Sequence, residues 1–162
     1  MKTFREYLKE AEDIEKKGTF GALHIIKESR NELHDWLTDH EIPEILDKND
    51  YHCTIVFSTK PVPEVADIPV KFPIKAKVKE WKVLGTDDLL VAVLESNKIV
   101  KLFNKTIEMG AKTDYPSFIP HISLAMHYKG QMPKEIPEFE IVFDKFKVGP
   151  LDADFKYGDD DE

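Results

Sequence analysis

Two segments of the chain repeat each other, and this repeat constrains fold and function more than any other feature of the sequence. Residues 52–60 read HCTIVFSTK, and residues 121–129 read HISLAMHYK. In each segment a hydroxyl residue follows the histidine after one intervening residue, and a lysine closes the segment. Such a repeat predicts two related pieces of structure that each hold one histidine and one hydroxyl.

Both segments alternate as a β-strand requires, because successive side chains of a strand point to opposite faces. In the first segment we expect one face to carry His52, Thr54, Val56 and Ser58, and the other to carry Cys53, Ile55 and Phe57. In the second we expect one face to carry His121, Ser123, Ala125 and His127, and the other to carry Ile122, Leu124 and Met126. Each strand then buries an apolar face opposite its histidine and hydroxyl.

A pair of histidines with nearby hydroxyls suits the cleavage of a phosphodiester. One group must take a proton from the attacking oxygen, and another must give a proton to the leaving oxygen. Histidine can do both near neutral pH, and hydroxyls can donate hydrogen bonds to the phosphate oxygens on which charge builds up. We therefore expect His52, Thr54, His121 and Ser123 to be catalytic, with no metal and no cofactor.

The composition limits the partners of such a site. The formal net charge is −8, which argues against a long nucleic acid, because duplex binding relies on many Lys and Arg contacts to phosphates. No apolar run reaches the roughly 20 residues that span a membrane. The single cysteine, Cys53, fits a reducing cytosol and, on its strand, a place in the core. We expect a cytoplasmic protein that binds a small anion, in an oligomeric state that the sequence leaves open.

The rest of the chain mixes helices with strand pairs, which is typical of the α+β class. The expected helices cover residues 1–17, 29–40 and 97–109, the second with Ser29 as N-cap and Glu32 completing a capping box. The expected strands cover residues 19–25, 51–58, 74–84, 89–95, 119–128 and 139–148, with a short edge at 152–157. We expect residues 1–157 to form one domain and residues 158–162 to form an acidic disordered tail.

The paired motifs resemble those of the 2H phosphoesterases, which carry two copies of the pattern His-x-[Ser/Thr]-x-hydrophobic. The resemblance covers residues 19–155. It implies two pseudo-symmetric lobes, each with an antiparallel sheet flanked by helices, and an active site in the central cleft. It also implies that the four motif residues are catalytic.

Within that superfamily the chain resembles the anti-CBASS protein 1 family of tailed phages. The similarity rests on residues 7–12, 18–20, 57–64 and 149–152. Phe20, Gly149 and Phe155 depart from the family pattern, which has a tyrosine, an acidic residue and a tryptophan there. The resemblance implies cleavage of the cyclic di- and trinucleotide messengers of CBASS, a bacterial antiviral signalling system. The partner would then be a small cyclic oligonucleotide in the host cytoplasm.

Five further residues are candidates for substrate binding. Trp81, which lies among lysines, is either a half-buried strand residue or a stacking platform for a base, and the resemblance implies a nucleobase contact. Phe20 and Tyr115 are candidate partners by the same reasoning. Lys60 and Lys129 are either solvated lysines at strand ends or cations that attract an anionic substrate into the cleft.

Two other functions stay open at the level of the sequence. An enzyme of the same class could act on RNA ends that carry a 2′,3′-cyclic phosphate, or on 2′-5′-linked oligoadenylate. A protein of another class would be a non-catalytic nucleotide-binding module or a phage structural protein. The intact motifs argue against this second alternative, since holding a nucleotide without cutting it requires neither histidine.

Overall fold

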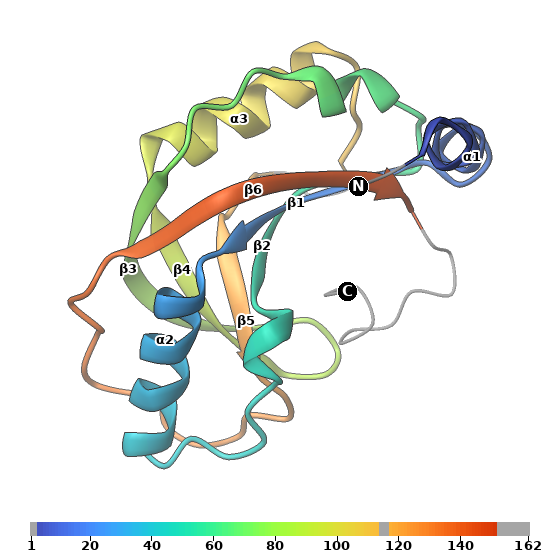
Figure 1. Cartoon of the computed structure of the whole chain (residues 1–162). Helices are drawn as coiled ribbons and strands as arrows, with labels where there is room; N and C mark the ends of the chain where they lie inside the picture. Colours follow the sequence, from blue (N-terminus) through green and yellow to red (C-terminus); the bar gives the residue numbers. More distant parts are fainter. Residues whose placement is uncertain (1–2, 114–116, 152–162) are drawn as a thin grey trace.

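Six strands form one sheet in the order β2–β1–β6–β3–β4–β5, and every neighbouring pair is antiparallel. The strands are β1 Thr19–Ile25, β2 His52–Ser58, β3 Ile74–Leu84, β4 Leu89–Glu95, β5 His121–Ala125 and β6 Ile141–Pro150. The structure, a computed structural model, describes residues 3–113 and 117–151 (Figure 1). The expected edge strand at 152–157 and the acidic tail at 158–162 lie outside the described residues. The predicted α+β class is confirmed.

Each half of the sheet repeats one arrangement of three strands. In the first half the edge strand β2 pairs with β1, and β1 pairs with β6. In the second half the edge strand β5 pairs with β4, and β4 pairs with β3. β3 joins the halves, because residues 74–76 pair with β6 and residues 77–84 pair with β4. The sheet curves until β2 and β5, the two motif strands, lie side by side (Figure 1).

Three α-helices flank this sheet: α1 Phe4–Lys17, α2 Lys27–Asp39 and α3 Asn97–Glu108, with 3₁₀ turns η1 Lys48–Asp50 and η2 Pro63–Asp67. α1 lies against β6, and α3 lies against β2 (Figure 1). α1 ends at Gly18 as predicted; the φ of this residue is 97°, and a Cβ atom would overlap the Ser58 carbonyl oxygen. Among the described residues, no helix has the length and apolar character that crossing a membrane requires.

The predicted capping box of the second helix is wrong. α2 begins at Lys27 with Ile26 as its N-cap, and Ile26 offers no side-chain hydrogen bond to the first turn. Ser29 is buried inside the helix, where its hydroxyl accepts a hydrogen bond of 3.0 Å from the Val142 amide. This bond ties α2 to β6, so a tertiary contact determines the role of Ser29 rather than local capping.

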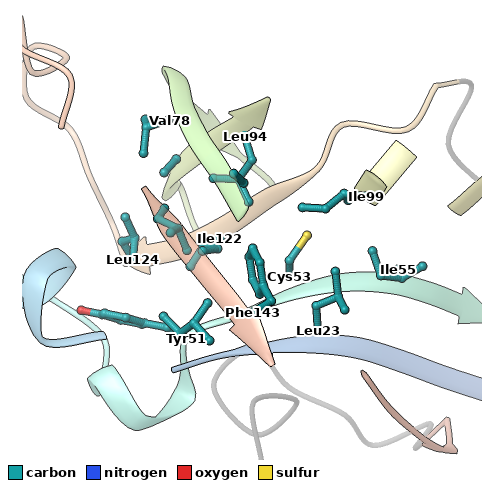
Figure 2. Close-up of a cluster of buried hydrophobic side chains, with 14 of the residues drawn as sticks. Leu23, Tyr51, Cys53, Ile55, Val78, Leu94, Ile99, Ile122, Leu124 and Phe143 are labelled. Atoms are coloured by element: carbon teal, nitrogen blue, oxygen red, sulfur yellow. The ribbon is translucent and has the colours of Figure 1, made fainter. Parts of the chain in front are cut away.

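The apolar faces of the two motif strands share one core (Figure 2). Cys53 and Ile55 of β2 and Ile122 and Leu124 of β5 are at most 3% exposed, and Phe143 of β6 lies among them (Figure 2). Burial raises the pKa of the Cys53 thiol to about 12, which confirms a core role for this cysteine. Because both strands anchor in one core, their opposite faces are held in a fixed relation.

Candidate active site

The two motifs meet at one cavity of about 410 Å³. Its wall includes His52 and Thr54 from β2 together with His121 and Ser123 from β5. His52 is only 8% exposed, and His121 is half-buried. All four residues that were predicted to be catalytic therefore border the same space, although they come from opposite ends of the strand order.

The two motif strands also share a backbone irregularity. In β2 the pairing with β1 shifts at Ile55, which is the extra residue of a β-bulge. In β5 the pairing with β4 shifts at Leu124. Each bulge lies three residues after the motif histidine, so the repeat extends from the sequence to the backbone. β-bulges re-aim neighbouring side chains and are frequent beside active sites.

Matching hydrogen bonds fix the two imidazole rings. The Nδ1 atom of His52 lies 2.9 Å from the Asp50 carbonyl oxygen, and the Nδ1 atom of His121 lies 2.7 Å from the Ile119 carbonyl oxygen. A carbonyl can only accept, so both Nδ1 atoms carry the proton and donate it. In the neutral rings Nε2 then carries no proton and can accept a hydrogen bond or a proton. The Nε2 atom of His52 lies 3.2 Å from the Thr54 hydroxyl, which donates to it.

Burial lowers the pKa of both histidines from the ordinary value near 6.5. The backbone hydrogen bond of each ring opposes this effect, and the charge of His121 lowers the pKa of His52 further. The lowered pKa favours the neutral form of both rings, which can accept a proton. A bound phosphate would favour the protonated form, because an opposite charge at short range stabilises it.

The bulge at Ile55 also explains why part of the predicted alternation is wrong. Val56 and Ser58 were expected on the same face as His52, but both are buried. Phe57 is instead 44% exposed and lines the cavity. One extra residue in a strand inverts the faces of all the side chains that follow it, and nothing in the local sequence marks a bulge here.

Aromatic rings form much of the remaining cavity wall. Phe20, one of the predicted substrate-binding residues, lines the cavity and lies edge to face with Phe57 at 6.4 Å and with His52 at 6.1 Å. Phe118 lines it from the loop before β5 and stacks on Phe103 of α3 at 4.0 Å. Phe57 and Phe118 were missed from the sequence; the only signal for Phe118 was an apolar residue three positions before His121.

Trp81 does not belong to this site, and its assignment as a substrate-binding residue is corrected. It is 8% exposed and stacks on Trp36 of α2, with ring centroids 5.1 Å apart. Its indole nitrogen donates a hydrogen bond of 2.9 Å to the Glu135 carbonyl oxygen. The alternative of a buried strand tryptophan is therefore the one that the structure shows, because packing between α2 and β3 covers the ring.

The two predicted lysines lie outside the cavity wall. Lys60 is exposed, and its amino group lies beside Gly110 after α3. Lys129 is 78% exposed and forms an ion pair of 3.5 Å with Asp88 in the turn between β3 and β4. Neither lysine lines the cavity, so their assignment as substrate-binding residues stays a prediction. Tyr115 lies outside the described residues.

Of two further histidines, His127 lies at the surface and His24 lies beside the candidate active site. His127 follows the end of β5 with a φ of 50° and lies 3.4 Å from Glu44, so the expectation that it shares a strand face with His121 is wrong. His24 of β1 stacks beside His52, with ring centroids 6.2 Å apart. Within residues 3–113 and 117–151, no cluster of three or more His, Cys, Asp or Glu side chains could hold a metal ion.

Comparison with known proteins identifies the family of the chain. The family model described as "Anti-CBASS protein Acb1" matches residues 17–158. The chain belongs to this Acb1 family. A curated anti-CBASS protein Acb1 from Vibrio phage KVP40 is 26% identical over 116 residues, covering 69% of this chain and 74% of the relative. As a member of the Acb1 family, the chain is an anti-CBASS protein.

Solved structures support the 2H phosphoesterase fold. TT0787 of Thermus thermophilus superposes with a TM-score of 0.62 at 18% identity, covering 80% of this chain and 86% of that one. LigT of E. coli, solved in complex with NADP⁺, superposes with a TM-score of 0.61 at 16% identity, covering 82% and 86%. The Acb1 family member therefore has the 2H phosphoesterase fold that the resemblance implied, with the two expected sheets joined into one six-stranded sheet.

Proposed function

We propose that the chain hydrolyses cyclic di- and trinucleotides by a metal-independent mechanism in which His52 and His121 are the acid and base. The observation that carries this proposal is the placement of both histidines on one cavity, each with its Nε2 atom left without a proton because Nδ1 donates to a backbone carbonyl. Acb1 family membership favours the CBASS messengers as substrates. The enzyme would then act in the cytoplasm of the infected host.

The reaction would proceed through two proton transfers at one phosphorus centre. One imidazole takes the proton of a ribose 2′-OH or of a water, and the new O–P bond forms as this oxygen attacks. The bond from phosphorus to the 5′-oxygen breaks, and the other imidazole donates its proton to that oxygen. With a 2′-OH as nucleophile, the first product is a linear nucleotide with a 2′,3′-cyclic phosphate end.

The remaining wall suits a small nucleotide. The Thr54 and Ser123 hydroxyls would donate hydrogen bonds to the non-bridging phosphate oxygens, on which charge increases in the transition state. Phe20, Phe57 and Phe118 offer ring faces and edges to a base, a contact that tolerates any base identity. A cavity of about 410 Å³ has the size typical of small-molecule sites, which favours a cyclic oligonucleotide over a long RNA.

A substrate panel tests this function. We expect the purified protein to linearise cyclic dinucleotides and cyclic trinucleotides, both before and after EDTA treatment and dialysis, with products separated by chromatography and identified by mass. Nucleoside 2′,3′-cyclic phosphates and 2′-5′ oligoadenylate, included in the same panel, represent the RNA-end alternatives. Activity confined to those two substrates would overturn the cyclic-oligonucleotide proposal. Loss of cleavage after EDTA treatment would overturn the metal-free mechanism, and recovery of tightly bound, uncut nucleotide would favour a binding module.

The pH profile should reflect the lowered pKa values of both histidines. The neutral base is lost below its pKa, and the protonated acid is lost above its pKa. A plot of kcat/KM against pH is therefore bell-shaped, and its two limbs give the pKa values of the base and the acid in the free enzyme. Since burial lowers both pKa values from about 6.5, we expect the optimum of kcat/KM below pH 6.5. The optimum of kcat should lie at higher pH, because bound phosphate raises both pKa values. Initial rates across the acidic and neutral pH range would measure both; a kcat/KM optimum on the alkaline side of neutrality would contradict this account.

A further inference from the structure

A second cavity, of about 380 Å³, is lined by His24, which stacks beside His52, and by Asp50, whose carbonyl oxygen accepts a hydrogen bond from His52. Four cationic side chains line it, Lys27 and Arg30 from α2 and Lys145 and Lys147 from β6, against two carboxylates, Asp50 and Asp144. We call it the basic cavity. The charged side chains that line the basic cavity are mostly positive, whereas the whole chain has a net charge of −8. Cationic side chains are therefore concentrated at this cavity.

The strand register places the basic cavity on the catalytic face of the sheet. His52 pairs with His24 on β1, and His24 pairs with Lys145 on β6. Directly paired residues of antiparallel strands point to the same face, so Lys145 shares the face of His52. The same argument applies one step along, since Thr54 pairs with Ala22 and Ala22 pairs with Lys147. Both lysines therefore lie on the side of the sheet that carries the first motif.

The second motif has an equivalent of the hydroxyl row, because Ser123 pairs with Val91 and Val91 pairs with Lys82, but it has no equivalent of the histidine row. His121 pairs with Val93 on β4, and Val93 pairs with Glu80 on β3. In the first half of the sheet the row that starts at the motif histidine thus ends in a lysine, whereas in the second half it ends in a carboxylate. The catalytic parts of the two halves match closely, so this difference is a specific departure from the repeat.

The surroundings of the basic cavity favour an anion. None of its four cationic side chains forms an ion pair with another described residue. The first turn of α2, which contributes Lys27 and Arg30, has no side-chain cap for its backbone N–H groups, and such groups favour negative charge. The pKa of His24 is lowered to about 4 by burial first and then by Lys147, His52 and Lys145, which reports the positive field at this position.

We propose that the basic cavity binds a phosphate group, and that this group is a second phosphodiester of the cyclic oligonucleotide being cut between His52 and His121. The identification of this phosphate group as part of the substrate rests on the proposed function. Every cyclic oligonucleotide carries at least two phosphodiesters, so one can lie between the catalytic histidines while its neighbour is held by Lys145 and Lys147. A substrate with one phosphate gains nothing from the basic cavity. Free inorganic phosphate has the same chemistry and is the other source to be tested.

The test compares two double substitutions that remove the same charge. K145Q/K147Q removes the two strand lysines of the basic cavity, and K75Q/K77Q removes two exposed lysines of β3 that do not line it. Binding is measured by calorimetry in an H121A background, in which the nucleotide stays uncut. We expect K145Q/K147Q to raise the Kd of a cyclic dinucleotide about tenfold or more, and to leave the Kd of a nucleoside 2′,3′-cyclic phosphate unchanged. K75Q/K77Q should change neither Kd.

A titration with inorganic phosphate separates the two sources. The imidazole signals of His24 are followed by NMR in the wild-type chain and in K145Q/K147Q, and melting temperatures confirm that both are folded. If phosphate shifts the His24 signals only in the wild type while the dinucleotide Kd is insensitive to the lysines, the cavity binds free phosphate. The phosphate titration requires no turnover, so it gives a result even if the chain cuts no cyclic nucleotide. If neither the dinucleotide Kd nor the phosphate shift depends on Lys145 and Lys147, the proposal is overturned.

Discussion

Replacing either motif histidine with alanine is expected to lower kcat on a cyclic dinucleotide by about 10²- to 10⁴-fold, the usual contribution of one positioned acid or base. His52→Ala removes one proton carrier from the cavity, and His121→Ala removes the other. Neither loss can be covered by the partner, because each ring is fixed by its own hydrogen bond to a backbone carbonyl. Single-turnover cleavage followed by chromatography would measure the effect.

The matched control for these two variants is His127→Asn. His127 belongs to the same repeat as His121, but it is exposed and lies beyond the end of β5. Asparagine tolerates its φ of 50°, so the fold should be kept and kcat should stay close to that of the wild type. Melting temperatures of all three variants show whether a lost rate reflects lost structure. Full activity in either His52→Ala or His121→Ala would contradict the proposed mechanism.

Removing the motif hydroxyls should have the second largest effect. Loss of one hydrogen-bond donor to a developing oxyanion costs about 10²- to 10³-fold in kcat, and we expect Thr54→Val and Ser123→Ala each to fall in this range. Without substrate the Thr54 hydroxyl donates its one proton to the Nε2 atom of His52, and it would turn to the phosphate oxygen when substrate binds. Valine keeps the shape of threonine, so the change isolates the hydroxyl group.

Stopped-assay measurement of kcat and KM separates this effect from weaker binding. The hydroxyls are proposed to act in the transition state, so kcat should fall while KM changes little. Thr38→Val on α2 is the control, because its hydroxyl bonds to the His34 carbonyl within the helix, away from the cavity. A rise in KM at constant kcat would show that Thr54 and Ser123 hold the ground state instead.

The sequence was sufficient to predict the parts of the site that depend on local pattern. The His-x-[Ser/Thr] repeat, the buried faces of Cys53 and Ile122 and the α+β order follow from period-two alternation and from helix stops such as Gly18. The meeting of the two motifs at one cavity was expected from the chemistry of a histidine pair and from the family resemblance. Local pattern could not predict it, because the pairing of distant strands depends on the whole chain.

The failures share a cause in tertiary structure. The bulge at Ile55 inverted the faces of Val56 and Phe57, and no residue type at that position announces a bulge. Trp81 fitted a stacking platform by composition, but the indole of Trp36 stacks on it from α2. The basic cavity was missed because only the register between β6, β1 and β2 places Lys145 and Lys147 on the same face as His52.

The most direct test of the central claim, that the two imidazoles serve as acid and base at one phosphorus centre, is a leaving-group experiment. A nucleoside 3′-(4-nitrophenyl phosphate) keeps the 2′-OH nucleophile but releases nitrophenolate, which leaves without a proton. We predict that one of the variants His52→Ala and His121→Ala recovers to within about tenfold of the wild-type rate on this substrate, because it lacks only the acid, while the other stays impaired by about 10²-fold or more. Equal impairment of both variants, or equal recovery of both, would contradict the account.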